Sequence, residues 1–542
     1  ALHENTTGAE NTAVGYAALQ NSVTASYNTA IGHDALTANS TGAYNVALGH
    51  EALKTNSTGT RNTACGWGAM YNATTGDRNT AVGNYALGDA TMTGDYNCAV
   101  GDNALRETTS GGENVAVGGE ALMDNTTASY NVAVGMQALT NNTTGDRNVA
   151  IGKGAMETNT VGDRNVAVGV GALGTYNPSS NEDSYNTAVG YNALVADTTG
   201  KENTAVGHFA LKTNTTGNYN TAVGYALRLN ATHSNNTAMG YQALDANTQS
   251  NNTAFGYGAL KANTTGGDNV AVGYLAGATA TTANYLTALG YQALTAATTG
   301  DSNTAVGYKA LTANTTGSSN TAVGNWALKA QNTGEQNSAF GFGCLDNLNG
   351  NTYYNTGVGY AAGDDVTTGD GNTLVGRRAG HNITTGTNCS MVGRDLTASA
   401  TDADREFIFG YNVTGKGDQT FYVSADQGVY HAGNTTTWST TSDVRIKKNI
   451  SDNNEGLALI NKITVRNFEY KTADEIESDG EVTVSAAIDK TGTQIGVIAQ
   501  ELQSVRESWV EQSSTGVLKV ETNDIIWHLV NSVKELSAQN DA

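Results

Sequence analysis

A motif of about 17 residues recurs along most of this chain, and such an internal repeat restricts the fold more than any other feature of the sequence. The consensus is N-T-A-V-G-Y-x-A-L-x-x-N-T-T-G-x-x, as in residues 303–319. The glycine that closes N-T-A-V-G recurs from Gly15 to Gly393 at an almost constant step, with one insertion around residues 176–183 that holds the only proline, Pro178. About 23 units follow one another, far more than the three or so that a stacked repeat array needs for stability.

The residue types within the unit favour a coil of parallel β-structure. Thr, Val and Tyr around N-T-A-V-G-Y are typical of an extended strand. N-T-T-G is typical of a turn in which Gly takes a positive φ, and Ala-Leu indicates a second strand or a tight corner. A helical solenoid needs more than about 30 residues per repeat and a wide apolar stripe, which this unit lacks. We therefore expect a mainly β fold in which residues 1–395 form a parallel β-solenoid (β-roll) shaft, roughly 110 Å long at a strand spacing near 4.8 Å.

Two sizeable apolar side chains recur in every unit, and we expect them to fill the interior of the coil. They are Val or Ile at the fourth position and Leu at the ninth, for example Val14 and Leu19. Two such residues make a thin core, and the small Ala residues at the third and eighth positions indicate close approach of another backbone. We therefore predict that three chains pack side by side. The first-position Asn, as in Asn11 and Asn28, should stack on its copies in a ladder of amide hydrogen bonds.

Charge and composition restrict the partners of the chain. The formal net charge is −22 at pH 7, which argues against nucleic acid and anionic membranes as partners because both require clustered Lys and Arg. No apolar run approaches the roughly 18 residues needed to cross a bilayer, so we expect no membrane insertion. Cys65, Cys98, Cys344 and Cys389 are far apart and form no C-x-x-C pair, which favours free thiols over disulfides or a metal site.

The repeated strand resembles that of a known family of surface proteins. The N-T-A-V-G strand is similar to the N-S-V-A-I-G strand in the heads of trimeric autotransporter adhesins, whose coils form left-handed parallel β-rolls in trimers. Their unit is shorter than the present one. The resemblance covers residues 5 to about 395 and implies a left-handed, trimeric β-roll. It implies no ligand.

Residues 396–441 have a different pattern, which predicts a short β connector or distal tip. Apolar residues alternate with glycine turns in E-F-I-F-G-Y-N-V and Q-T-F-Y-V-S-A-D-Q-G-V-Y-H-A-G, as in short strands. Aromatic residues in strands are usually buried, so these are expected to form the core of a trimer. They are Phe407, Phe409, Phe421, Tyr422, Tyr430 and Trp438.

Residues 442–542 predict a small α+β domain with ordinary charge density. The segments T-S-D-V-R-I-K-K-N-I, I-N-K-I-T-V-R-N-F-E-Y, Q-I-G-V-I-A-Q-E-L-Q-S-V and V-L-K-V-E-T-N-D-I-I-W-H-L-V-N-S-V-K-E-L occur in this order. They resemble the intramolecular chaperone domain of phage tailspikes and fibres, the peptidase S74 family, and the last part resembles structural proteins of phages infecting marine cyanobacteria. Apolar residues between Ile525 and Leu536 predict one face of a final helix, capped by Asn523 or Thr522 and packed against its copies in the trimer.

The resemblance implies a self-cleavage site at the start of this domain. Members of the family trimerise and fold their fibre and then cut at a Ser-Asp bond, which corresponds here to Ser442 and Asp443, with Lys447 as the implied base. A lysine held in a poorly solvated site can lose its proton and act as a base. Lys448 is the competing base. A Ser442 hydroxyl cannot easily attack its own carbonyl, so its detailed role stays open.

The combined features lead to one functional hypothesis with two alternatives. We expect a tail fibre of a phage virion, assembled in the host cytoplasm as a homotrimer, which binds a glycan or protein receptor on the host cell. The chain begins in mid-unit, so we expect a missing upstream region to join other tail proteins. The alternatives are a bacterial trimeric surface adhesin and a polysaccharide-degrading tailspike.

We expect no cofactor, no metal and no catalysis beyond a single autoproteolytic cut. Carboxylates such as Asp34, Glu51 and Asp102 occupy no fixed pair of positions, which counts against a glycosidase shaft. Asp364, Asp365 and Asp370 are interpreted as turn residues rather than calcium ligands, because their spacing fits no EF-hand loop.

Overall fold

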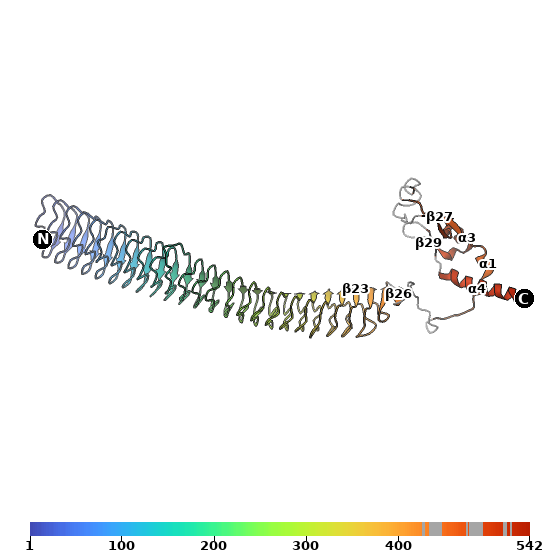
Figure 1. Cartoon of the computed structure of the whole chain (residues 1–542). Helices are drawn as coiled ribbons and strands as arrows, with labels where there is room; N and C mark the ends of the chain where they lie inside the picture. Colours follow the sequence, from blue (N-terminus) through green and yellow to red (C-terminus); the bar gives the residue numbers. More distant parts are fainter. Residues whose placement is uncertain are drawn as a thin grey trace. The chain divides into compact units, whose positions relative to one another are not determined.

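The structure, a computed structural model, describes residues 1–424, 429–432, 447–472, 475, 492–512, 518–520 and 523–541. The chain divides into two compact units, Ala1–Thr440 and Thr441–Ala542. In the first unit, successive coils stack along one axis, each contributing one short strand to a continuous ladder (Figure 1). The Ala-Leu segment of the repeat forms a tight corner rather than a second strand.

The strands of the first unit follow the T-A-V part of the repeat and are mostly three residues long. They are β1 Thr12–Val14, β2 Thr29–Ile31, β3 Val46–Leu48, β4 Thr63–Cys65, β5 Thr80–Val82, β6 Cys98–Val100, β7 Val115–Val117, β8 Val132–Val134, β9 Val149–Ile151, β10 Val166–Val168, β11 Thr187–Val189, β12 Thr204–Val206, β13 Thr221–Val223, β14 Thr237–Met239, β15 Thr253–Phe255, β16 Val270–Val272, β17 Thr287–Leu289, β18 Thr304–Val306, β19 Thr321–Val323, β20 Ser338–Phe340, β21 Thr356–Val358, β22 Thr373–Val375, β23 Ser390–Arg394, β24 Phe407–Tyr411, β25 Thr420–Ser424 and β26 Val429–Ala432.

Each strand from β1 to β24 pairs in parallel with the next, and like positions of the repeat lie side by side. Ala13 pairs with Ala30, for example. The parallel β-solenoid predicted from the period is therefore confirmed, while its handedness stays a prediction.

The expectation that the period ends at Gly393 is wrong, because Gly393 pairs with Gly410 and one further coil of the same length follows. Among the strands that the structure describes in this unit, β26 alone reverses direction, pairing antiparallel with β25.

The prediction that the fourth-position residue fills the interior is wrong. Ala30, at the third position, has no exposed surface, whereas Ile31 is 39% exposed and Val14 is 58% exposed. The first-position Asn faces inward, and side chains alternate along a strand, so the third position must also face inward and the second and fourth must face out. The Leu prediction is confirmed, since Leu36 is buried. The interior consists of third- and eighth-position Ala with ninth-position Leu, so the small Ala residues accommodate the opposite wall of the same coil.

The first-position asparagines form the predicted ladder, although most of its bonds go to the backbone. Asn28 donates its backbone N–H to Oδ1 of Asn11 at 2.9 Å, and its Nδ2 donates to the carbonyl of Gly42 at 2.9 Å. Asn45 donates to Oδ1 of Asn28 in the same way. Each buried amide thus closes its own coil and joins it to the next coil, and each such bond stabilises the stack by about 1 kcal/mol.

A second ladder, which was not predicted from the sequence, runs through the twelfth-position Asn of the N-T-T-G turn. Here one side-chain amide donates directly to the next, as from Asn56 Nδ2 to Asn39 Oδ1 at 2.9 Å and from Asn159 Nδ2 to Asn142 Oδ1 at 3.0 Å. Asn159 also binds its own turn, because Gly162 donates N–H to its Oδ1 and accepts from its Nδ2. The turn is therefore held by a side chain that is both donor and acceptor.

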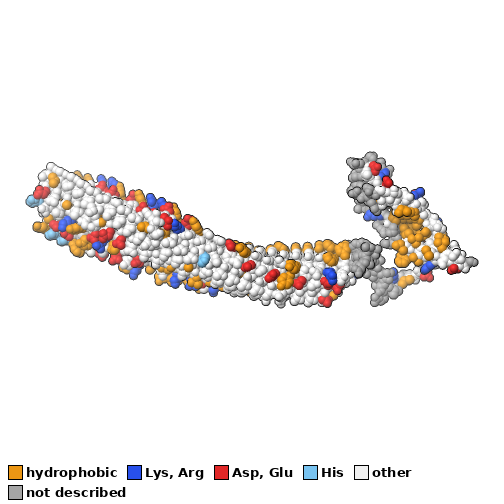
Figure 2. All heavy atoms as spheres, in the orientation of Figure 1, with side chains coloured by type: hydrophobic (Ala, Val, Ile, Leu, Met, Phe, Trp, Pro, Cys, Tyr) orange, Lys and Arg blue, Asp and Glu red, His pale blue; other side chains and the backbone are white. Residues whose placement is uncertain are grey.

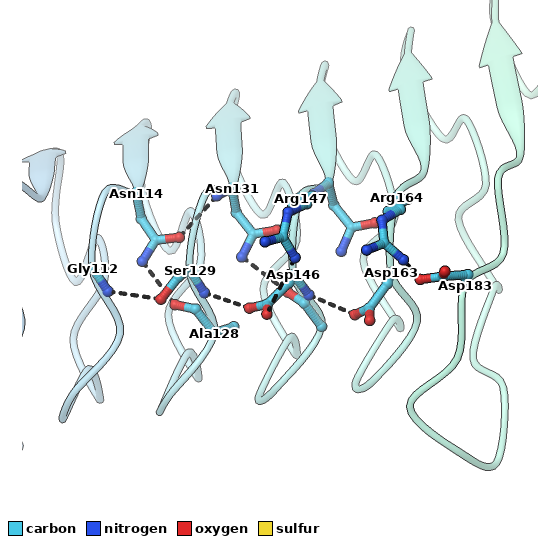
Figure 3. Close-up of polar contacts among 12 residues, drawn as sticks. Gly112, Asn114, Ala128, Ser129, Asn131, Asp146, Arg147, Asp163, Arg164 and Asp183 are labelled. Atoms are coloured by element: carbon cyan, nitrogen blue, oxygen red, sulfur yellow. Dashed lines mark hydrogen bonds and ion pairs between the residues drawn. The ribbon is translucent and has the colours of Figure 1, made fainter.

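A third row of polar contacts joins the turns on the outside of the coils. Gly112 donates its N–H to Ser129 Oγ, Ser129 donates to Asp146 Oδ1, and Asp146 donates to Asp163 Oδ1 (Figure 3). Asp370 occupies the same position of the repeat, and its Oδ1 accepts the N–H of Tyr353 at 2.7 Å. A backbone hydrogen bond thus accounts for Asp370, as the interpretation of a turn residue requires.

Glycine is required at two positions of the unit for different reasons. Gly290, which follows its strand, has a φ of +138°, and a Cβ there would lie 2.4 Å from the carbonyl oxygen of Gly307 in the next coil. Gly42, in the N-T-T-G turn, does not have the positive φ that was predicted. It is constrained by space instead, since a Cβ there would lie 2.3 Å from the carbonyl oxygen of Gly59.

The second unit contains short helices and two antiparallel strand pairs. Its elements are α1 Leu457–Ile460, β27 Arg466–Phe468, β28 Gln494–Gly496, α3 Ala499–Val505, the 3-10 helix η3 Glu507–Trp509, β29 Val510–Gln512, β30 Leu518–Val520 and α4 Asn523–Asn540. Strand β27 pairs with β28, and β29 pairs with β30. Helix α1 packs against α4, and α3 packs against β29 and β30.

We predict that Gly290→Ala destabilises the shaft by roughly 2–4 kcal/mol, because it combines a strained positive φ with a backbone clash. Gly119→Ala is the matched control: its φ is unstrained and the nearest atom to a new Cβ is 4.0 Å away, so its free energy of unfolding should stay within about 0.5 kcal/mol of the wild type. Chemical unfolding followed by circular dichroism measures both. Equal losses for the two variants would contradict the stacking argument.

Asp197 occupies the twelfth position, where many coils have Asn, and one side-chain hydrogen bond of the ladder is missing there. Its Oδ1 accepts the N–H of Gly200 at 2.8 Å, but Oδ2, which stands where Asn has its donor, is without a hydrogen-bond partner among the described residues. Burial raises the pKa of Asp197 to about 7. The folded state therefore favours the protonated acid, which restores a donor to this rung, and ionisation of Asp197 destabilises the shaft.

The raised pKa predicts a pH-dependent effect of Asp197→Asn. Because the folded pKa exceeds the unfolded one, the wild type loses stability as the pH rises from about 4 to about 7. The variant should match the wild type near pH 4 and exceed its free energy of unfolding by up to about 4 kcal/mol at pH 8. Denaturant unfolding at the two pH values tests this. Asn214→Asp, one coil away, should introduce the same pH dependence, and a difference that does not vary with pH would refute the assignment.

Candidate functional site

The start of α1 is held by a side chain from the far end of the second unit. Leu457 donates its N–H to Glu535 Oε2, on α4, at 2.8 Å. A helix N-terminus has backbone donors without partners in the helix, and a carboxylate is a suitable acceptor for them. A Cβ on Gly456 would lie 2.5 Å from Glu535 Oε1, so glycine is needed for this approach.

A polar cluster beside this junction joins three parts of the unit. His528 on α4 lies with Nδ1 2.7 Å from the carbonyl oxygen of Glu455 and with Nε2 2.9 Å from Arg506 Nη1. The tautomer that satisfies both contacts is the neutral one with its proton on Nδ1, which donates to Glu455 while Nε2 accepts from Arg506. Arg506 also bonds the Glu455 carboxylate and lies 5.5 Å from the ring centroid of Trp509, a residue with only 1% exposed surface.

The predicted cleavage residues lie immediately before this region. Ser442 and Asp443 are outside the described residues, and so is Arg445 of the same motif. Lys447 and Lys448 are described, and both side chains are exposed. The roles assigned to Ser442, Asp443 and Lys447 therefore stay predictions.

Comparison with known protein families identifies this segment. Residues 442–511 match the family Peptidase_S74, described as chaperone of endosialidase. The C-terminal unit carries a peptidase S74 domain. The match begins at Ser442 and includes Lys447 together with Glu455, Arg506 and Trp509 of the cluster, so the resemblance found in the sequence is confirmed. No curated protein and no solved structure matches the chain.

Helix α4, which follows the segment matched to the S74 family, has two different faces. His528 and Ser532 are buried, and Glu535 caps α1 from the same side. The apolar face predicted from the sequence is open in the single chain: Ile526, Leu529, Val530, Val533 and Leu536 are all exposed. The helix is thus held within the S74 unit by its polar side, and its apolar side is available for another surface.

Two outward-facing rows of the shaft sheet, the second and fourth positions of the repeat, carry no charge from β1 to β25. The second and fourth positions of β1 to β25 hold Thr, Ser, Val, Ile, Leu, Met, Phe and Cys, and none holds a charged residue. Rows of apolar side chains are visible along the shaft, while charged groups lie beside them (Figure 2). Phe407 and Phe409 of β24 extend these rows, whereas Tyr422 of β25 faces the interior. We call the second- and fourth-position rows the sheet face.

An aromatic row borders the sheet face at the sixth position of the repeat. From Tyr191 to Tyr308 every coil contributes a stacked ring, with neighbouring centroids between 5.1 and 6.2 Å apart. Stacked rings of this kind stabilise neighbouring coils beyond the burial of their area. In the sequence this Tyr was interpreted only as a strand signal, although its recurrence one residue after the glycine indicates a row.

The described residues offer neither a metal cluster nor a membrane span. They contain no group of three or more His, Cys, Asp or Glu that could hold a metal ion. Within the same part of the chain, no helix is long and apolar enough to cross a membrane. The four cysteines are free thiols, as the sequence predicted, with Cys344 and Cys389 buried and Cys65 and Cys98 on the sheet face.

Proposed function

We propose that the protein is a homotrimeric tail fibre of a phage virion, which attaches to the host cell and is matured by its S74 domain. The long β-solenoid and the S74 domain on one chain fit a phage tail fibre or tailspike. The single observation that carries the fibre assignment is the fusion of this domain, matched over residues 442–511, to a repetitive shaft. A chaperone domain is useful to such a shaft, because coils stacked across several chains expose strand edges until their register is set.

The uncharged sheet face supports a symmetric assembly of parallel chains. Around a three-fold axis, every residue close to the axis meets its own copies, so any charged residue there would repel two identical charges. A heterologous partner imposes no such restriction, because opposite charges can then be matched. The complete absence of charge at the second and fourth positions is what a parallel, unstaggered homotrimer requires. The exposed apolar side of α4 offers the S74 unit a similar contact.

The proposed maturation is one cut between Ser442 and Asp443. The Ser442 hydroxyl is required for the cut, and Lys447 serves as the base that accepts a proton. Chaperoning depends on the folded surface of the domain, including the junction of α1 with α4, and does not require the hydroxyl. Folding and cutting should therefore be separable by mutation.

Host attachment is tested by the binding of purified trimer to host cells. Binding that saturates and is competed by unlabelled trimer is expected for a fibre. Release of reducing ends from host surface glycan would indicate a polysaccharide-degrading tailspike instead. Failure to bind any host cell, with the trimer intact, would contradict attachment.

We predict that Val206→Glu on the sheet face prevents trimer formation, since it would place three carboxylates together at the axis. Thr216→Glu adds the same charge on an exposed turn of the same coil and should leave the trimer intact. Sedimentation at micromolar concentration and resistance to SDS distinguish the two variants. A trimeric Val206→Glu protein, or a monomeric wild type, would remove the sheet face from the assembly.

We predict that expression yields two fragments, a shaft that ends at Ser442 and a piece of about 100 residues that begins with Asp443. Ser442→Ala should abolish the cut and still give folded trimers, and Lys447→Ala should do the same. Lys448→Ala is the control and should cut normally. Mass spectrometry of the products locates the cut. An uncut wild-type trimer, or a Ser442→Ala chain that is cut like wild type, would contradict the proposed chemistry.

A further inference from the structure

The last position of the repeat unit, directly before the first-position Asn, carries an acidic residue between two tyrosines on three successive coils. These residues are Tyr96, Glu113 and Tyr130. Tyr96 is 51% exposed and Tyr130 is 48% exposed, so both rings are open to the solvent over about half of their surface. The row lies on the turn side of the strands, beside the sheet face and not on it.

Arginine covers the outer side of each of these tyrosines. Arg78, one coil before Tyr96, has its guanidinium carbon 5.0 Å from the centroid of that ring. Arg147, one coil after Tyr130, lies 5.1 Å from the centroid of Tyr130. Since neighbours in this row stack coil upon coil, the remaining side of each ring is directed toward the coil of Glu113.

The space between the two tyrosines is a hollow of about 280 Å³. It is lined by Tyr96 and Tyr130, by the acidic residues Asp95 and Glu113, and by Ser110, Gly112 and Ser129. Gly112 contributes no side chain, and its N–H is already bound to Ser129 Oγ, so the floor is small and fixed (Figure 3). Asp95 is also held in place, because its Oδ1 accepts the N–H of Asp77 at 2.7 Å.

The hollow has negative charge and no cation of its own. Its lining contains neither Lys nor Arg. The Glu113 side chain has no hydrogen bond or ion pair with any residue that the structure describes. An aromatic surface attracts cations through the electron-rich face of the ring, and a nearby carboxylate adds to that attraction.

A second Tyr-Glu-Tyr row on the same chain provides a contrast. Tyr185, Glu202 and Tyr219 occupy the same position on three later coils. Lys201 stands there in the place of Gly112, with its Nζ 2.7 Å from Glu182. The second row thus has a cation of its own next to its glutamate, and the first row has a glycine at that place.

We propose that the hollow between Tyr96 and Tyr130 is a binding site for an organic ammonium cation. The two open ring faces enclose the cationic head, and the Glu113 carboxylate balances its charge. A role in binding amino groups on the host surface rests on the proposed attachment function, whereas the binding of an ammonium cation in the hollow does not. Three copies of the shaft would offer three such sites at one height, which strengthens attachment to a polymeric ligand.

The test uses the full-length protein and pairs of probes that differ in charge. Choline is compared with 3,3-dimethylbutanol, its neutral analogue, and glucosamine is compared with N-acetylglucosamine, by calorimetric titration and saturation-transfer NMR. We expect a millimolar dissociation constant for the cations and at least about fivefold weaker binding of the neutral analogues. Preference for choline would indicate a quaternary head, and preference for glucosamine a primary amine.

Variants locate the site on the shaft. Glu113→Gln and the double variant Tyr96→Leu with Tyr130→Leu should each weaken cation binding at least about fivefold. The matched controls are Glu202→Gln in the second row and Tyr44→Leu, whose ring stacks on Tyr27 at 4.8 Å, and both should bind like wild type. Circular dichroism confirms that each variant is folded.

Equal binding of charged and neutral probes, unchanged affinity of the Glu113→Gln variant, or no binding at the solubility limit of choline would overturn the site. These failures are distinct from failure of the proposed function. A trimer that is cut normally and attaches to host cells but does not bind the ammonium probes contradicts the proposed cation site alone. A protein that binds choline through Glu113 but attaches to no cell contradicts the attachment role alone.

Discussion

The inward direction of the first-position asparagine determines the cross-section of the shaft. Asn28 uses its backbone N–H, its Oδ1 and its Nδ2 at once, which joins its coil to the coils before and after it. Such an amide must be buried, and once it is buried the pleat sends the third position inward and the second and fourth outward. A small Ala at the third position then fits against the opposite wall, and the β-branched residues are left on the surface. The uncharged sheet face is thus a consequence of the hydrogen-bond ladder.

The period and residue types were sufficient to predict the coil, its strand and its parallel pairing. These features depend on the conformational preferences of single residues and on the stacking of equivalent residues in successive coils. The fourth-position residue was incorrectly assigned to the interior, because the assignment considered only the size and apolarity of its side chain. It did not consider that side chains alternate between the two faces of a strand and that the inward-facing first-position Asn therefore directs the fourth position outward. Gly42 shows the same limit: its sequence context indicates a turn, but the requirement for glycine arises from the carbonyl of Gly59 in the next coil. Contacts between coils are not visible within one repeat unit.

The C-terminal unit differs, because its sequence segments identified a family while its contacts could not be foreseen. Glu455, Arg506 and His528 come from three separate parts of the sequence, and no spacing rule brings them together. Helix α4 was predicted from apolar spacing, yet the side that packs within the unit carries His528 and Ser532. Apolar spacing locates a helix face that is to be covered, and it does not say whether the covering surface belongs to the same chain.

Irregular coils bear on how the chains are arranged in the proposed trimer. Val166 pairs with Thr187 across a lengthened coil, and Thr221 pairs with Thr237 across a shortened one, yet each strand keeps its register. The turns therefore absorb insertions and deletions, while the strand ladder fixes the height of every coil. In a staggered assembly, a long coil of one chain would lie level with a normal coil of its neighbour, and the contacts would differ around the axis. An unstaggered parallel trimer brings equal coils to equal height, so the same irregularities that the ladder tolerates also specify the alignment of the three chains.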